Sequence, residues 1–173
     1  MELENLIDFE ALREVMEEKY ATTGMPVGVV DLDTGEIYID VGWRRICQQF
    51  HRKNPQSNIK CLESDTVLKD NLRGNNYCRY KCGNGLWDIG IPVTIKGAVI
   101  CGIFIGQFFY KGEQPDFEYF MNQGLRYGYD IDDYLSALND VPVFPREKVE
   151  EIIDFYRDLA LSLEKKAEKI LKG

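Results

Sequence analysis

The sequence lacks long hydrophobic runs and a basic leader. No apolar stretch approaches the roughly 18 residues that a membrane-spanning helix requires, and the N-terminal segment MELENLIDFE is acidic. A membrane span and a signal peptide are therefore not expected. The 29 acidic residues outnumber the 21 lysines and arginines, which gives a formal net charge of −8. Because such a field repels phosphate backbones and anionic membranes, we expect no nucleic-acid or membrane partner and predict a cytoplasmic protein.

Signatures of common catalytic sites are also missing. The chain has a single histidine, no Cys-x-x-Cys pair and no glycine-rich phosphate loop. No cysteine, histidine and Asn or Asp set stands out as a nucleophile with its base and orienting residue. Helix caps and surface turns explain Ser64-Asp65, Asp88 and Asp132-Asp133 more simply than catalysis does. We therefore predict that the protein is not an enzyme and carries no cofactor.

What is present is enough for a globular core. The chain has 173 residues, of which 45% are hydrophobic and 29% charged, and these proportions are ordinary for a folded protein. A chain of about 150 residues buries about 70% of the surface that it exposes when unfolded. We predict one main domain over residues 1–144, followed by a C-terminal helix over residues 145–173.

The first half of the chain alternates helices and strands. A helix is predicted over residues 6–24, with Asp8 as its N-cap and Gly24 as its left-handed stop. Residues 26–40 then read as two strands joined by a tight turn at residues 33–35. Two helices are predicted next, over residues 43–54 and 57–75. Ser57 is the expected cap of the second, whose inner side is predicted to carry Ile59, Leu62, Thr66 and Leu72.

The second half returns to strands and ends in a long helix. Strands are predicted over residues 77–82, 86–95 and 98–110, and the last is almost uniformly apolar, as in a central strand that is covered on both faces. Short helices are predicted over residues 116–128 and 131–141. The final helix carries an apolar seam with heptad-like spacing, which predicts a possible homodimer through Val149, Ile152, Tyr156, Leu159 and Leu163, resuming at Ile170.

This order of elements predicts an α+β, PAS-like fold. About five antiparallel strands form one wall of a small cavity, helices lie on one face of the sheet, and a long C-terminal helix follows. Concave spaces of this kind are where small ligands bind.

The residues also resemble a family. Residues 1–110 look like the PocR ligand-binding domain, a PAS-like sensory module. No single matching segment is specific, but their order and spacing together are. The segments are Leu6-Ile7-Asp8, Thr23-Gly24-x-Pro26-Val27, Val29-Val30-Asp31, Cys47, Cys61-x-x-Ser64-Asp65, Tyr80-x-Cys82, Gly85-Leu86, Asp88, Pro92-Val93 and Gly106-Gln107.

The resemblance implies a sensor of small hydrocarbon derivatives such as short alcohols or diols, with residues 1–144 as the ligand-sensing domain and residues 145–173 as a signalling or dimerisation helix. It also implies an output domain in a longer chain, such as the histidine kinase of a two-component system or a transcription regulator. Members often carry histidine directly after the cysteine that is Cys82 here, whereas this chain has Gly83.

Eight residues on the segments expected to enclose the pocket are predicted to bind the ligand. A buried, unpaired amide costs about 1–3 kcal/mol, so the glutamine at the end of the apolar central strand needs a partner from the fold or from a ligand. The eight are Trp43, Cys47, Phe50, Cys61, Tyr80, Cys82, Trp87 and Gln107.

Three interpretations remain open for Cys47, Cys61 and Cys82. They pack as small hydrophobes, line the pocket as weakly polar groups, or ligate a soft metal in a metal- or cofactor-binding sensor. Cys78 and Cys82 alone cannot chelate an ion, because residues four apart on a straight strand are about 13 Å apart. His51 lies in the basic stretch FHRK and is expected at the surface.

Overall fold

The computed structural model describes residues 2–74, 77–113 and 116–173. Five strands form an antiparallel sheet in the order β2-β1-β5-β4-β3, and a short sixth strand, β6, pairs in parallel with β5. The predicted α+β fold with a central β5 is therefore confirmed. The strands are β1 (Val27–Asp31), β2 (Ile37–Val41), β3 (Cys78–Lys81), β4 (Trp87–Ile95), β5 (Ala98–Tyr110) and β6 (Val143–Phe144).

The first helix and hairpin follow the local signals in the sequence. Helix α1 (Phe9–Thr23) follows a 3-10 turn, η1 (Leu3–Asn5), and begins where Asp8 Oδ1 accepts a hydrogen bond from the amide of Ala11 at 3.0 Å. It ends at Gly24, whose φ of 75° is left-handed. The Asp31 carboxylate then accepts hydrogen bonds from the amides of Asp33 and Thr34 in the β1–β2 turn, each at 2.8 Å.

Helix α2 (Pro55–Gly74) begins earlier than predicted and presents a different face. Its N-cap is Asn54, whose Oδ1 accepts hydrogen bonds from the amides of Gln56 and Ser57, so the cap assignment to Ser57 was wrong. The predicted end at Asn75 lies outside the described residues.

The predicted inner side of α2 was also largely wrong. Ile59 and Leu62 are 56% and 55% exposed, and Thr66 is exposed too, whereas Leu72 is buried as expected. The residues that face the sheet are Cys61, Ser64, Leu68 and Leu72. Both stripes have helical spacing, so the sequence pattern alone does not decide which of them faces the sheet.

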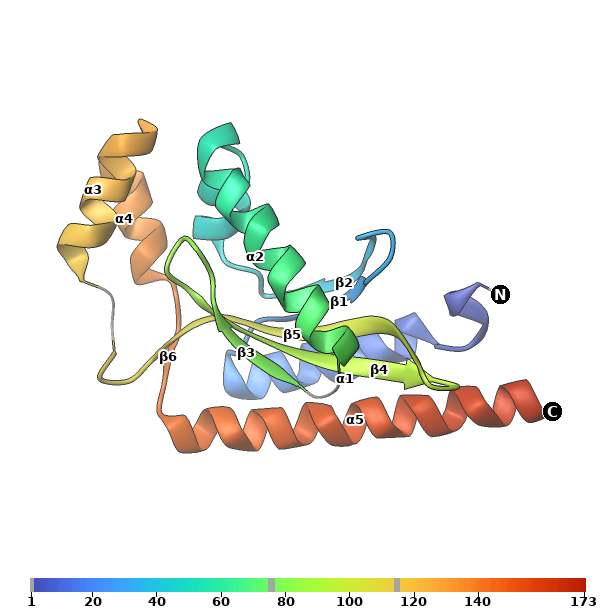
Figure 1. Cartoon of the computed structure of the whole chain (residues 1–173). Helices are drawn as coiled ribbons and strands as arrows, with labels where there is room; N and C mark the ends of the chain where they lie inside the picture. The colour runs from blue at the N-terminus through green and yellow to red at the C-terminus, as the bar shows by residue number, and fades with distance from the viewer. Residues whose placement is uncertain (1, 75–76, 114–115) are drawn as a thin grey trace.

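Helices cover both faces of the sheet. Helix α2 lies over one face, while α1 and the long α5 (Arg146–Lys172) lie along the other (Figure 1). The main core forms between α1, α5 and the sheet. In the described residues no helix is long and apolar enough to cross a membrane.

The apolar seam of α5 packs within this core. Val149, Ile152, Tyr156 and Leu163 are buried against the sheet, and Leu159 is half-buried beside them. The homodimer predicted through this seam would require these side chains to leave the sheet.

A helical hairpin completes the fold. Helices α3 (Phe117–Tyr127) and α4 (Ile131–Asn139) form a second core with the short π-helix η2 (Ile46–His51), and α4 leads through β6 into α5. The predicted helix over residues 43–54 is thus reduced to η2. The hairpin holds one end of the segment that bears Cys47, His51 and Arg52.

Candidate functional site

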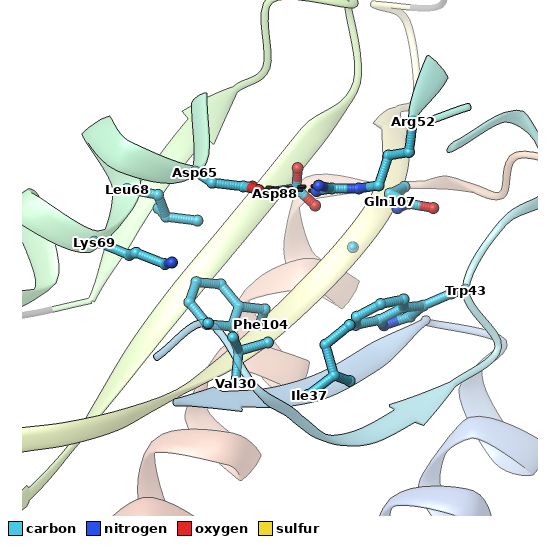
Figure 2. A pocket seen from close by; sticks show the side chains of 12 residues that line it. Val30, Ile37, Trp43, Arg52, Asp65, Leu68, Lys69, Asp88, Phe104 and Gln107 are labelled. Carbon is cyan, nitrogen blue, oxygen red and sulfur yellow. Dashed lines mark hydrogen bonds and ion pairs between the residues drawn. The ribbon is translucent and has the colours of Figure 1, made fainter. Parts of the chain in front are cut away.

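A cavity of about 180 Å³ lies between α2 and the sheet (Figure 2). It is where the sequence predicted a pocket. Trp43 can lie flat against β1 because Gly28 has no side chain there: a Cβ would come within 2.6 Å of the indole ring. The lining residues are Val30, Gly35, Ile37, Trp43, Arg52, Asp65, Leu68, Lys69, Asp88, Phe104, Gly106 and Gln107.

A smaller hollow of about 20 Å³ adjoins the first. Cys47 from η2, Cys61 from α2 and Cys82 after β3 all line it, together with His51, Ser64 and Tyr80. The two spaces share Arg52, Asp65, Leu68, Asp88 and Gln107, so they are parts of one site. The predicted convergence of the sulfurs is therefore observed, around a space that holds about one water molecule.

An ion pair lies where the two spaces meet. Arg52 Nη1 and Nη2 donate to the two carboxylate oxygens of Asp65 at 3.0 and 3.2 Å (Figure 2). The side chains are 43% and 37% exposed. A bidentate pair fixes the plane of the guanidinium and uses both oxygens of Asp65.

Asp88 brings a carboxyl group into both spaces. It pairs across the sheet with Gly106, and a Cβ at Gly106 would overlap the Asp88 carboxylate, so only glycine leaves room for that side chain. Desolvation raises the pKa of Asp88 to about 7, with a further contribution from Asp65, while Arg52 opposes the shift.

Only one of the two polar atoms in the Gln107 side-chain amide forms a hydrogen bond within the protein. Its Oε1 accepts a hydrogen bond from the backbone amide of Arg44 at 2.9 Å. Asp88 pairs with Gly106 and Trp87 with Phe108, so Gln107 is the extra residue of a β-bulge. A bulge redirects a side chain, and here it turns Gln107 toward the cavity.

The three thiols are poor nucleophiles. Desolvation raises the pKa of Cys47, Cys61 and Cys82, in the last case to about 12, so all three stay protonated near neutral pH. The sulfur atoms of Cys61 and Cys82 accept hydrogen bonds from Asn84 Nδ2 and the Leu86 amide at 3.2 and 3.3 Å. In the part of the chain that the structure describes, no three His, Cys, Asp or Glu residues are grouped as metal ligands.

His51 is buried, contrary to the sequence expectation. It is 1% exposed, and its Nε2 lies 2.7 Å from the Tyr134 hydroxyl. Gln123 Nε2 donates to that hydroxyl at 2.9 Å, which leaves the hydroxyl hydrogen for His51 Nε2. Burial lowers the pKa of His51 to about 3, with smaller contributions from Lys60 and Arg52, so the ring is neutral.

Six of the eight predicted residues line the site: Trp43, Cys47, Cys61, Tyr80, Cys82 and Gln107. Phe50 and Trp87 line neither space. Phe50 packs edge-on against Tyr129 and Tyr134, and Trp87 packs against Tyr110 in the main core. Trp87 and Asp88 are neighbours on one strand, and they point to opposite faces.

Sequence reasoning missed the charged residues of the site. Arg52 follows η2 and Asp65 lies on α2, 13 residues further along the chain, and their pairing has no local signal. Asp88 did have a local sequence signal, because it is the single charged residue in the apolar run LWDIGIPV. A lone acid in a strand that is covered on both faces needs a partner or a cavity.

A comparison with known protein families shows to which family the chain belongs. The family described as the sensory domain found in PocR matches residues 5–168. The chain belongs to the PocR sensory domain family. The match extends the resemblance beyond residue 110, through the α3–α4 hairpin and most of α5.

A curated relative agrees with this assignment. Regulatory protein PocR of Salmonella typhimurium is 28% identical over 102 residues, which cover 58% of this chain and 33% of that protein. The chain thus spans about a third of the length of the relative it matches. No match was found among solved structures.

Proposed function

We propose that this PocR domain senses a small, weakly polar metabolite of the short alcohol or diol class. The observation that carries the proposal is the site between α2 and the sheet, in which rings and aliphatic side chains surround a few polar groups. Its volume of about 180 Å³ suits a molecule of only a few heavy atoms, since drug-sized ligands occupy pockets of about 300–1,000 Å³.

We further propose that occupancy is relayed through α5 to an output such as a histidine kinase or a transcription regulator in a cytoplasmic signalling protein. Strand β4 supports this route, because Asp88 faces the site while the neighbouring Ile89 is in the core that includes α5. A ligand shifts α5 only if it binds two arrangements of the domain with different affinity.

The family and the site both support a sensor rather than an enzyme. The family is described as sensory. The thiols are protonated, and His51 Nε2 is occupied by Tyr134 rather than by a second reactive group. The polar groups of the site are therefore assigned to binding.

Thermal unfolding in the presence of two- to four-carbon alcohols and diols tests the proposal. We expect at least one compound to raise Tm, because a ligand that binds the native state stabilises it. Cys47→Ser and Cys82→Ser should weaken this shift more than Cys101→Ser, since Cys101 is buried in the main core away from the site. A broad panel without any stabilisation would refute the ligand class.

Elemental analysis of anaerobically purified protein tests the metal alternative. Less than about one metal per ten chains would exclude a resident metal, because a ligated site binds its ion tightly.

A further inference from the structure

The polar side chains of the site differ in whether they already form hydrogen bonds within the protein. Both oxygens of Asp65 accept from Arg52, and Oε1 of Gln107 accepts from the Arg44 amide. In the described residues no hydrogen bond uses the Asp88 carboxylate or Gln107 Nε2. Of the two lining carboxylates, Asp88 is thus the one without a hydrogen bond, and Gln107 offers a free donor next to it.

Local backbone geometry holds these two groups together. Asp88 lies opposite Gly106 in the register, and Gln107 follows Gly106 in the bulge, so the two residues are neighbours across β4 and β5. Both line the larger cavity and the smaller hollow. At the junction of its two parts, the site therefore presents the Asp88 carboxylate as an acceptor and Gln107 Nε2 as a donor on adjacent strands.

We propose that Asp88 and Gln107 form the polar anchor of the ligand: Asp88 accepts a hydrogen bond from a ligand hydroxyl, and Gln107 Nε2 donates one to a neighbouring ligand oxygen. This assignment rests on the proposed sensing function and names the residues that select its ligand. A molecule with oxygens on adjacent carbons, at least one of them a hydroxyl, satisfies both groups.

The charges around Asp88 decide how binding depends on pH. Arg52 and Asp65 form a neutral pair, and Lys69 adds a cation from α2. The Cys47, Cys61 and Cys82 thiols, the Tyr80 phenol and the neutral His51 also face this space. The three thiols and His51 keep their charge between pH 6 and 8, whereas the pKa of Asp88 lies in this range.

A ligand hydroxyl that donates to Asp88 favours the ionised carboxylate. Binding therefore releases a proton when Asp88 is protonated in the free domain. From the pKa of about 7, affinity should rise about tenfold between pH 6 and pH 8 and then level off.

Isothermal titration calorimetry at pH 6, 7 and 8, in buffers of different ionisation enthalpy, tests the anchor. The probes are a three-carbon 1,2-diol, its dimethyl ether, which has no hydroxyl, and the matching monoalcohol. We expect the diol to bind most tightly, the monoalcohol more weakly and the dimethyl ether not at all. Proton release should accompany diol binding at pH 6.

Three variants separate the roles of the two residues. Asp88→Asn should abolish proton release and the tenfold pH dependence. Gln107→Glu keeps an oxygen for the Arg44 amide but loses the free donor, so the advantage of the diol over the monoalcohol should disappear. Asp70→Asn, an exposed change on α2, is the control and should behave as the wild type.

The outcomes distinguish the anchor from the sensing function. If the wild type binds the diol but Asp88→Asn binds it with the same affinity and pH dependence, the anchor is wrong and the sensor proposal stands. If the wild type binds none of the probes at any pH, the diol class itself is refuted, and the anchor with it.

Discussion

Two buried groups should make opposite contributions to stability between pH 5 and pH 8. His51 is the only histidine in the chain, and its pKa falls from 6.5 to about 3 on folding. Because the unfolded chain binds a proton that the native state excludes, stability is lost as pH falls through this range. At pH 5 the loss relative to pH 8 is about 2 kcal/mol, set mainly by the unfolded pKa.

Asp88 acts in the opposite direction. Its pKa rises from 3.8 to about 7 on folding, so the native state binds the extra proton. Its contribution is fully present below the unfolded pKa and is lost as pH rises toward 7. Between pH 5 and pH 8 this loss is about 1–2.5 kcal/mol, where the lower figure allows for solvent that reaches the half-buried carboxyl.

The wild-type domain should therefore show little net change, and single variants should reveal the two slopes. Urea unfolding at pH 5, 6.5 and 8 measures them. Asp88→Asn should be less stable at pH 5 than at pH 8 by about 2 kcal/mol, the His51 contribution alone. His51→Gln should be more stable at pH 5 by about 1–2.5 kcal/mol, the Asp88 contribution alone. If either variant matched the flat wild-type profile, the remaining group would be solvated in the native domain and the reasoning would be wrong.

Further predictions concern the backbone and the packing of the site. Gly106→Ala should cost more than about 2 kcal/mol and weaken ligand binding, because a Cβ there overlaps Asp88; Gly97→Ala, also at positive φ but with no atom within 4 Å, should cost about 1 kcal/mol without affecting binding. Leu68→Ala should destabilise the domain by about 2–4 kcal/mol, whereas Leu62→Ala should stay within about 0.5 kcal/mol; equal effects would contradict the observed orientation of α2. Removing residues 145–173 should abolish cooperative urea unfolding, since their apolar stripe completes the core; a sharp transition in the shortened chain would show that α5 is dispensable.

Local sequence signals predicted the helices and strands well. Asp8 and Gly24 mark the ends of α1 because capping depends only on neighbouring backbone groups. The uniformly apolar run of β5 predicted its central position, since only a strand covered on both faces needs no polar side. The order of the strands in the sheet, by contrast, was not predicted, because it depends on contacts between distant segments.

Positions that depend on distant partners were less predictable. Two apolar stripes compete on α2, and the choice between them is made by the sheet, where Gly90 leaves room for Leu68 of the observed stripe. His51 looks solvated in the sequence because its neighbours are basic, whereas its partner Tyr134 is 83 residues away. Asp88 was attributed to a helix cap or a surface turn, whereas it lies within β4 opposite Gly106, and that long-range pairing has no local signal.

The alternation of β4 connects the site to the long helix. Gly90 lies under Leu68 and Leu72 of α2, on the same face of the strand as Asp88, while Ile89, Ile91 and Val93 pack in the core with α5. A close-packed interior transmits small displacements because it has few voids to absorb them. In the proposed relay, a ligand bound to Asp88 would shift a strand whose other face is in contact with α5. This places the proposed anchor and the proposed output helix on opposite sides of one strand.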